Sequence, residues 1–256
     1  MRILVCNDDG IHAPGLAALE DVARELSDDV WTVAPETEQS GASHSLTFTE
    51  PLRLRQLEPR KFAVQGTPSD CIVLALEHVL KDKKPNLLLS GVNRGQNVAE
   101  DVTYSGTIAA AMEGTLLGIR AIALSQVYGF DGGPVAWENA RQYGPALIRQ
   151  LLGFDWPAGV LMNINFPDGM PEAVKGTRVT VQGHRHAGEL KVEAREDPRG
   201  APYFWIAFRR GAGEVAPDTD LHAVRAGYIS VTPLHLDLTH AGMMDGLRQA
   251  LGEGGE

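Results

Sequence analysis

The sequence predicts an α/β fold built on a doubly wound, mostly parallel sheet, and three observations indicate it. Short runs such as Ile3-Leu4-Val5-Cys6 and Leu87-Leu88-Leu89 are apolar at every position, as in strands that are covered on both faces. Helical patterns separate these runs, which is typical of parallel strands joined by crossover helices. Polar segments rich in glycine follow several runs directly, at the edge where such sheets bind their ligands.

The elements of the core alternate along the chain. The first helix has a clear pattern, because Leu16, Leu19, Val22 and Leu26 recur at helical spacing. A second helix is expected to start at Thr67-Pro68-Ser69-Asp70. The expected core strands are residues 2–6, 30–34, 86–90, 119–124 and 160–165, and the expected helices are residues 15–27, 71–80, 107–117 and 137–152. Three more short strands, at residues 46–49, 52–55 and 62–64, are expected to form an insertion.

Two parts of the chain are expected from the change in pattern after residue 182. Residues 1–182 form the α/β core, with the functional site at the carboxyl ends of its strands. In residues 183–256 the expected elements are two arms of a long hairpin at 191–195 and 203–209, helices at 219–226 and 243–251, and an extended segment at 228–231. We expect this second part to serve oligomerisation.

Composition restricts the partners of the protein. The formal net charge of −10 argues against a general affinity for nucleic acid or for an anionic membrane surface. No apolar stretch approaches the roughly 20 residues of a membrane helix, and the first apolar run is too short for a signal peptide. Cys6 and Cys71 are interpreted as reduced core thiols, so we expect a cytoplasmic location.

Asp8 and Asp9 stand side by side where the first strand ends. Two such charges about 4 Å apart repel by roughly 4 kcal/mol at an effective dielectric of about 20. A divalent cation held by both carboxylates removes this repulsion, and Gly10 lets the chain bend so that both can face one point. The alternative is an Asx-type turn with a helix-start carboxylate.

Two other segments carry groups that suit a phosphate or a metal. Ser105-Gly106-Thr107 opens a helix, where free backbone N–H groups bind phosphate, although an ordinary N-cap is the commoner role of such residues. Asn93 and Asn97 flank Gly95, and a side-chain amide offers an oxygen to a metal or an N–H to a phosphate. Asparagines in turns are the alternative for this loop.

Ser40 and the histidines are weaker candidates for the functional site. Ser40 and His44 lie in a polar loop and can be cap or turn residues. His44 is interpreted as a hydrogen-bonding or substrate-side group rather than a metal ligand, because no second histidine lies nearby at ligand spacing. His184-Arg185-His186 is a minor metal candidate at the start of the hairpin.

Six segments in this order resemble one protein family. They are Asn7-Asp8-Asp9-Gly10, His44-Ser45-Leu46-Thr47, Gly66-Thr67-Pro68-Ser69-Asp70-Cys71, Ser90-Gly91-Val92-Asn93-Arg94-Gly95-Gln96-Asn97, Tyr104-Ser105-Gly106-Thr107 and Thr232-Pro233-Leu234. Together they resemble the SurE family of survival-protein 5′-nucleotidases, from residue 1 to about residue 235.

The resemblance implies a Rossmann-like fold and metal-dependent hydrolysis of nucleoside 5′-monophosphates, sometimes with other phosphomonoesters or short polyphosphate as substrates. It implies a homodimer or a homotetramer. Ser40 is preferred to Ser43 as a ligand because of its four-residue spacing before His44. The resemblance implies one divalent cation, Mg²⁺, Mn²⁺ or Ca²⁺, held by Asp8, Asp9, Ser40 and Asn93. It implies that Asp8 and Asp9 are also catalytic. The substrate phosphate would be bound by Asn97, Ser105, Gly106 and Thr107.

Several alternatives stay open from the residues. The expected nucleophile is water held by the cation, with Asp8 or Asp9 taking its proton, and a covalent aspartyl-phosphate is the rival. A receiver-like signalling domain also has an acidic pair after its first strand, but the loop after residue 89 holds Asn93 and no aspartate until Asp101. A zinc deacetylase needs a histidine beside the pair, where Asn7 stands. A non-catalytic nucleotide-binding module is the remaining alternative.

Overall fold

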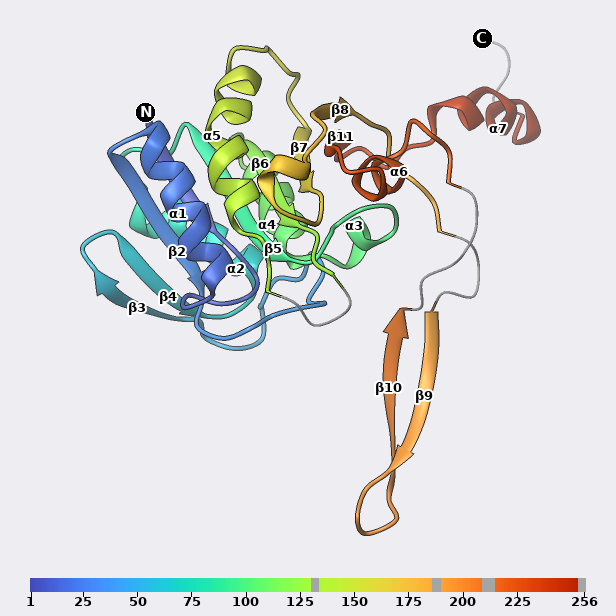
Figure 1. Ribbon diagram of the computed structural model, residues 1–256, viewed down its shortest axis with the longest axis horizontal. Helices are drawn as coiled ribbons and strands as arrows, with labels where there is room; N and C mark the ends of the chain where they lie inside the picture. The colour runs from blue at the N-terminus through green and yellow to red at the C-terminus, as the bar shows by residue number, and fades with distance from the viewer. Residues whose placement is uncertain (130–133, 186–189, 209–214, 253–256) are drawn as a thin grey trace.

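The computed structural model describes residues 1–129, 134–185, 190–208 and 215–252, and within them one large sheet forms the centre of the molecule (Figure 1). Its strands are β1 Arg2–Cys6, β2 Asp29–Pro35, β3 Arg53–Glu58, β4 Lys61–Gln65, β5 Leu87–Arg94, β6 Arg120–Gln126, β7 Val160–Phe166, β8 Thr177–Val179 and β11 Ile229–His235. Their order is β3-β4-β2-β1-β5-β6-β7-β11-β8. All neighbours are parallel except β3 with β4 and β7 with β11, which confirms the predicted fold class.

Helices cover both faces of the sheet. They are α1 Pro14–Leu26, α2 Pro68–Leu74 with a π-helical turn Ala75–Val79, α3 Asp101–Tyr104, α4 Gly106–Leu116, α5 Glu138–Leu152, α6 Asp220–Arg225 and α7 Met244–Ala250, with short 3₁₀ turns at Pro171–Ala173 and Ala241–Met243. Side chains of β1 point alternately to the two layers. Ile3 and Val5 pack in the cluster formed with α1 and α5, whereas Leu4 and Cys6 pack in the cluster formed with α2 and α4. The apolar runs therefore reflect strands buried on both faces.

The strand order reverses beside β1. The chain runs from β1 to β2 and β4 on one side of the sheet, then returns to β5, β6 and β7 on the other side. β1 and β5 are parallel neighbours, with Cys6 opposite Ser90. The carboxyl ends of these two strands therefore form the topological switch point, where open α/β sheets bind their ligands.

Three expectations about local structure are corrected. Residues 46–49 form no strand, because the N–H and the hydroxyl of Thr47 donate to the Asp70 carboxylate at 2.9 and 2.7 Å instead of to a neighbouring strand. The strands expected at 52–55 and 62–64 are β3 and β4, which extend the edge of the main sheet rather than form an insertion. Strand β5 continues through Asn93 and Arg94, which were expected in a loop.

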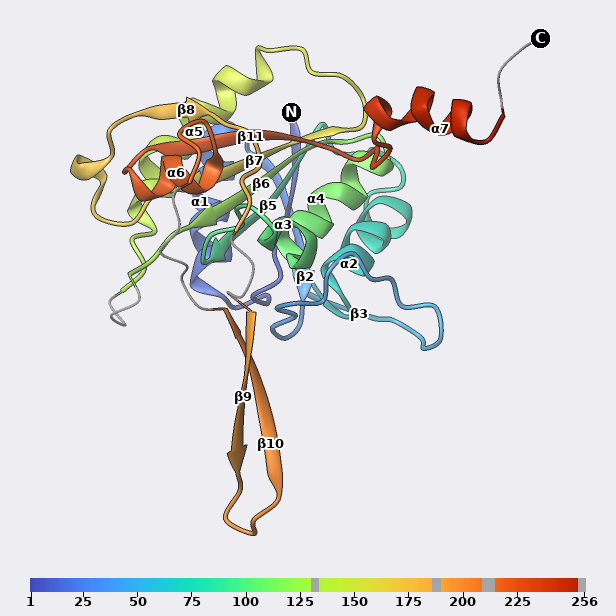
Figure 2. The same cartoon turned by 90° about the vertical axis from the view of Figure 1, so that its right-hand side faces the viewer.

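The later part of the chain both joins the sheet and extends from it. Strand β11 lies between β7 and β8, so the sheet crosses the expected boundary at residue 182. Strands β9 Leu190–Glu196 and β10 Pro202–Phe208 form the predicted hairpin, which projects away from the body (Figure 2). The expected arm ends at Arg209, and this residue and residues 253–256 of the tail lie outside the described residues. None of the described helices has the length and apolar character needed to span a membrane.

Candidate active site

Asp8 occupies the turn that follows β1. The amide of Asn7 donates to the carbonyl of Gly10 at 3.0 Å, and Gly10 takes a φ of +102°, which closes the turn. The Asp8 side chain is buried, and its Oδ1 accepts a hydrogen bond from the Thr107 hydroxyl. The backbone of Asp8 accepts from the N–H of Gln39 at 2.8 Å. The turn is thus fixed by the start of α4 and by the loop at Gln39.

The start of α4 lies directly against Asp8. A Cβ atom at Gly106 would lie 2.8 Å from the Asp8 Cβ and 3.0 Å from its Oδ2, so only glycine allows this approach. Ser105 caps the helix, because its hydroxyl accepts from the N–H of Ile108 at 3.1 Å. The first turn of α4 therefore lies next to the Asp8 carboxylate, and the Thr107 N–H is directed at it.

Asp9 joins the β1 turn to the end of β5. Its Oδ2 accepts from the N–H of Arg94 at 3.1 Å. Strand β5 reaches this point because the register with β6 shifts between Ser90 and Asn93. At Gly91 the φ is +137° and a Cβ would lie 2.2 Å from the Leu124 carbonyl oxygen, so a side chain there would block the shift.

Asn93 directly precedes Arg94, whose N–H reaches Asp9. The Asn93 amide nitrogen donates to the Gly95 carbonyl at 2.9 Å, which leaves the amide oxygen as the atom available to a cation. Ser40 lies in the loop tied to Asp8 through Gln39, and its hydroxyl donates to Glu38 at 2.8 Å. The lone pairs of that hydroxyl are available to a cation as well.

The carboxylates of the turn are electrostatically unfavourable as anions. Burial, with a smaller contribution from the charge of Asp9, raises the pKa of Asp8 from 3.8 to about 6. Burial also raises the pKa of Asp9, and the charge of Glu38 adds to this effect. A bound cation would favour both ionised forms, because its charge adds to the attraction that Arg94 already exerts on Asp9.

Ser43 and His44 have structural partners elsewhere. The Ser43 hydroxyl donates to the Thr103 carbonyl at 2.8 Å, so it is directed at α3. The Nε2 atom of His44 lies 2.8 Å from Oε2 of Glu113, a largely buried residue of α4. This contact agrees with the interpretation of His44 as a hydrogen-bonding group.

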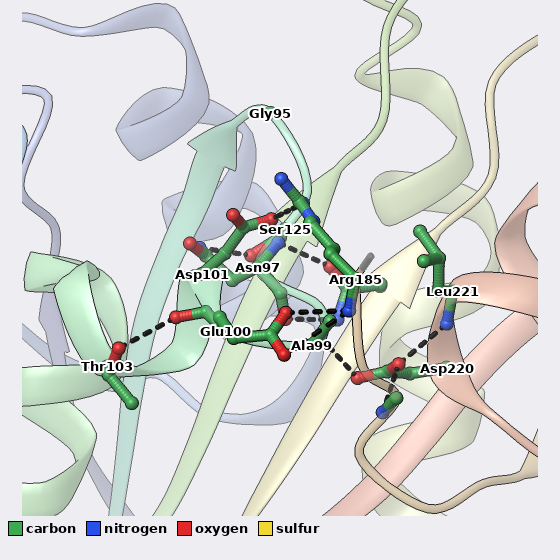
Figure 3. Close-up of polar contacts among 12 residues, drawn as sticks. Gly95, Asn97, Ala99, Glu100, Asp101, Thr103, Ser125, Arg185, Asp220 and Leu221 are labelled. Atoms are coloured by element: carbon green, nitrogen blue, oxygen red, sulfur yellow. Dashed lines mark hydrogen bonds and ion pairs between the residues drawn. The ribbon is translucent and has the colours of Figure 1, made fainter. Parts of the chain in front are cut away.

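Asn97 is held by a buried polar network on β6 and β7. Its N–H donates to Oδ1 of Asn165 at 2.8 Å, and its carbonyl accepts from Asn163 at 2.8 Å and from Asn165 at 3.1 Å. Its own amide nitrogen donates to the Ser125 hydroxyl at 2.8 Å (Figure 3). The polar atoms of one loop residue are thus fixed by three fully buried side chains.

The loop after Asn97 is fixed by the later part of the chain. Asp220, at the start of α6, accepts from the N–H groups of Ala99 at 3.0 Å and Gly183 at 2.9 Å (Figure 3). Ala99 has a φ of +54°, which is unfavourable for alanine, so this bond holds a conformation that the residue would not choose alone. Arg185 forms an ion pair with Asp101.

The minor metal candidate near the hairpin has other contacts. The Nδ1 atom of His184 lies 3.3 Å from Glu100, and the N–H of Arg185 donates to the same carboxylate at 3.0 Å. His186 lies outside the described residues. The described side chains of this segment therefore support the loop at Glu100 and Asp101.

Sequence reasoning missed the residues that hold the loop. Asn163 and Asn165 stand two positions apart in an otherwise apolar strand, and this alternation could have indicated two buried amides on one face. Thr219-Asp220 reads from the sequence as an ordinary helix start, and the structure indeed has Thr219 as the N-cap. Nothing local indicates that Asp220 reaches Ala99.

The donor set suits a hard divalent cation. Among the described residues, no group of three or more His, Cys, Asp and Glu side chains could hold a metal. The set implied by the resemblance is instead two carboxylates, the amide oxygen of Asn93 and the hydroxyl of Ser40, all of them oxygen donors. Such all-oxygen sets suit Mg²⁺, Mn²⁺ or Ca²⁺ rather than zinc.

Comparisons with known proteins agree with one another. The family model described as survival protein SurE matches residues 3–189. A protein of Methylorubrum extorquens (strain PA1) named 5′-nucleotidase SurE is 61% identical over 240 residues, which cover 93% of this chain and 94% of that protein. One of the same name from Brucella suis is 59% identical and covers 98% of this chain and 99% of its own length. The crystal structure of the SurE protein from Aquifex aeolicus aligns with a TM-score of 0.85 at 40% identity, covering 98% of this chain and all of that one (100%).

Proposed function

The chain belongs to the SurE family, and we propose that it is a metal-dependent 5′-nucleotidase that hydrolyses nucleoside 5′-monophosphates to nucleoside and phosphate. One observation carries the proposal. Asp8 and Asp9 lie at the switch point of the sheet and contact both other elements that the reaction needs, the start of α4 through Thr107 and the end of β5 through Arg94.

We assign the cation to Asp8, Asp9, Ser40 and Asn93. A divalent cation at this centre supplies positive charge that stabilises the phosphoryl group and makes a coordinated water more acidic. The buried Asp8 carboxylate and its neighbour hold this charge next to the substrate. The neutral amide and hydroxyl oxygens complete the set without adding further anions.

The start of α4 is assigned to the phosphate. The backbone N–H of Gly106 lies beside Asp8 and can donate to a phosphate oxygen, and the helix dipole favours the same charge. The Thr107 N–H is directed at the Asp8 carboxylate and is shared with it. The remaining N–H of the Asn97 amide can donate as well, since only one is used by Ser125. Phosphoryl transfer depends mainly on such positioning and charge stabilisation.

The same carboxylates are assigned the proton transfer. A water molecule that attacks phosphorus forms the new P–O bond while the P–O bond to the nucleoside breaks. Its proton passes to Asp8 or Asp9 and from there to the 5′-oxygen of the departing nucleoside, which leaves as an alcohol. Either carboxylate can accept that proton because the cation keeps the pair ionised and because both lie where the water would be held. The rival path, in which one aspartate attacks phosphorus, forms an acyl-phosphate that acid quenching would trap.

The test is phosphate release from a nucleoside 5′-monophosphate with each metal in turn. We expect EDTA to abolish turnover and Mn²⁺ or Mg²⁺ to restore it. Full activity in chelator would remove the cation from the mechanism. A receiver-like domain would accept phosphate once, and a non-catalytic binding module would bind the nucleotide without releasing phosphate, so either outcome would contradict the proposal.

We also propose that the enzyme is a cytoplasmic homodimer or homotetramer that associates through the β9–β10 hairpin. Isolated two-stranded hairpins are marginally stable in water, and this one exposes Phe204, Trp205 and Ile206. Cys6 and Cys71 are both buried and free, which suits a reducing compartment.

A further inference from the structure

A hollow of about 360 Å³ opens beside Asp9. It lies between the start of α1, the end of β5 and the segment that leads into α5. Its wall includes Asp9, Glu38, Arg94, Val135 and Trp137. Its volume lies within the range of small-molecule sites, roughly 300–1,000 Å³. Asp9 is therefore shared between the proposed metal centre and this wall.

The aromatic side of the hollow is built on a glycine. Gly15 is in the first turn of α1, and a Cβ there would lie 3.0 Å from Cη2 of Trp137 and 2.0 Å from the Val92 carbonyl oxygen. The absent side chain lets the Trp137 indole lie against the helix. The ring is only half-buried and belongs to the lining, so it presents apolar surface to the hollow.

The polar side of the hollow carries both signs of charge. The Arg94 guanidinium lies 5.2 Å from the centre of the Tyr128 ring, a contact that restricts its position. Oε1 of Glu38 accepts a hydrogen bond from the Ser40 hydroxyl at 2.8 Å, and Oε2 is the second acceptor atom of this carboxylate. One wall thus offers N–H donors and carboxylate acceptors to a ligand that also contacts an aromatic face.

We propose that this hollow receives the nucleoside part of the substrate, with the base against Trp137 and the polar groups of base or ribose near Arg94 and Glu38. The inference rests on the proposed function, because it needs a phosphate ester held at Asp8 and Asp9. The alcohol part of such an ester leaves the metal centre from the side of Asp9, where the hollow begins. A nucleoside supplies both a flat ring for the indole and hydroxyl or amino groups for the charged wall.

The test compares two substrates in the metal-loaded enzyme. Adenosine 5′-monophosphate carries a base, whereas glycerol phosphate does not, and the ratio of their kcat/KM values reports the nucleoside contacts. We expect Trp137→Leu to lower this ratio by about 5-fold or more, because stacking of a base on an aromatic ring contributes at least this factor. Trp137→Phe, which keeps a ring, should retain most of the ratio.

A matched control exists at the opposite edge of the sheet. Trp156 likewise lines a hollow, a smaller one of about 200 Å³, where the Arg120 guanidinium lies 5.2 Å from its ring centre. Trp156→Leu should leave the ratio unchanged. A second variant covers the case in which Trp137→Leu does not fold. Val135→Trp fills the hollow from its half-exposed wall and should lower the same ratio.

Outcomes for the hollow and for the proposed function can be separated. An unchanged ratio in a folded Trp137→Leu variant, or in Val135→Trp if that variant alone folds, overturns the inference while hydrolysis itself stands. If the wild-type enzyme hydrolyses neither ester, equilibrium binding of the nucleotide with Mg²⁺ decides the question. Weaker binding in the variant supports the hollow as a nucleoside site, whereas equal binding or no binding by the wild type overturns it.

Discussion

The hydroxyl of Thr107 donates a hydrogen bond to Oδ1 of Asp8 and so joins the first turn of α4 to the end of β1. The two residues are 99 positions apart in the chain. Their contact brings the carboxylate assigned to the cation next to the N–H groups assigned to the phosphate. The expected effects of substitutions at the site follow from this junction.

Replacing Asp8 with asparagine should separate activity from stability. In chelator the folded-state pKa of Asp8 is about 6, above its ordinary 3.8, so its stabilising effect is complete only below pH of about 4 and is lost as the pH rises through 6. At pH 7.5 the ionised group destabilises the fold, and Asp8→Asn removes that charge while its amide oxygen can still accept from Thr107. We expect equal or higher stability in urea unfolding, with turnover lower by on the order of 10³-fold.

Asp9→Asn provides the companion measurement. Its amide can keep the acceptor for the Arg94 N–H, and burial raises the pKa of Asp9 as well, so the fold should tolerate the change. Turnover should fall to a similar extent. Near-normal rates in both variants would end the assignment of the pair to catalysis.

The Thr107 hydroxyl and the Thr107 backbone have separable roles. Thr107→Ala removes the bond to Asp8 but keeps the helix-start N–H, so we expect kcat/KM to fall only by about 10-fold, within the range for one hydrogen bond to a charged group. Thr107→Ser keeps the hydroxyl and should restore most of the activity. A loss in the serine variant as large as in the alanine variant would show that the methyl group, and not the hydrogen bond, matters.

The sequence was enough to predict that Asp8 and Asp9 lie near the start of α4, because their signal is local. Asp8 and Asp9 follow an apolar run, and Ser105 to Thr107 precede a helical pattern, so the order of the parallel strands sufficed to bring them to one edge. The elements of the core were predicted within a few residues for the same reason. The central strands are buried on both faces and the helices α1 and α5 are amphipathic, so the pattern is repeated along these elements.

What the sequence did not show depends on contacts between distant segments. Residues 46–49 do not form the expected strand because the N–H of Thr47 donates to Asp70, 23 residues later. Strand β5 gained Asn93 because the missing side chain of Gly91 allows the backbone to approach Leu124. Asp220 reaches Ala99 across 121 positions. No local pattern indicates such a partner, since each depends on tertiary packing.

Ser125 should act on catalysis through Asn97. Ser125→Ala removes the acceptor of the Asn97 amide, so the side chain is free to rotate away from the phosphate. We expect kcat/KM to fall about 5-fold and stability to fall by about 1 kcal/mol. The matched control is Ser230→Ala, in a strand equally buried, whose hydroxyl pairs with Thr180. The control should lose similar stability but keep kcat/KM, and an equal loss of kcat/KM in both would refute a positioning role.

Asp101 should make the stability of the fold depend on pH. Burial outweighs the attraction of Arg185 and raises the pKa of Asp101 from 3.8 to about 6. Because the folded state then holds the proton more tightly, stability is greatest below pH of about 4 and is lost as the pH rises through 6. Urea unfolding in chelator should therefore show a fall in stability from pH 5 to pH 7 that is smaller in Asp101→Asn, whose amide oxygen can still accept from Arg185.

A remaining slope of the same sign is expected in that variant, since Asp8 also has a pKa of about 6. The carboxylates with lowered pKa values, such as Glu20 and Asp29, titrate below this window and do not contribute to it. Identical slopes in the wild type and in Asp101→Asn would show that the ion pair with Arg185 dominates over burial.

The hairpin can be tested by changing one of its faces. Ile206 lies opposite Val192 in the register, and Phe204 is two residues away, so these three side chains share a face. All three are more than 60% exposed, at 72%, 66% and 63%, respectively.

If this face is covered by a second copy, changing Phe204 and Ile206 to serine should reduce the mass measured by light scattering to that of one chain, 27.6 kDa. The control is a variant with Phe154→Ser and Met170→Ser. These two apolar residues lie elsewhere and are similarly exposed, at 62% and 60%, so the variant should keep the mass of the wild type. A wild-type protein that already has the mass of one chain, or a hairpin variant that keeps the oligomeric mass, would contradict association through this face, because the two substitutions remove most of its exposed apolar area.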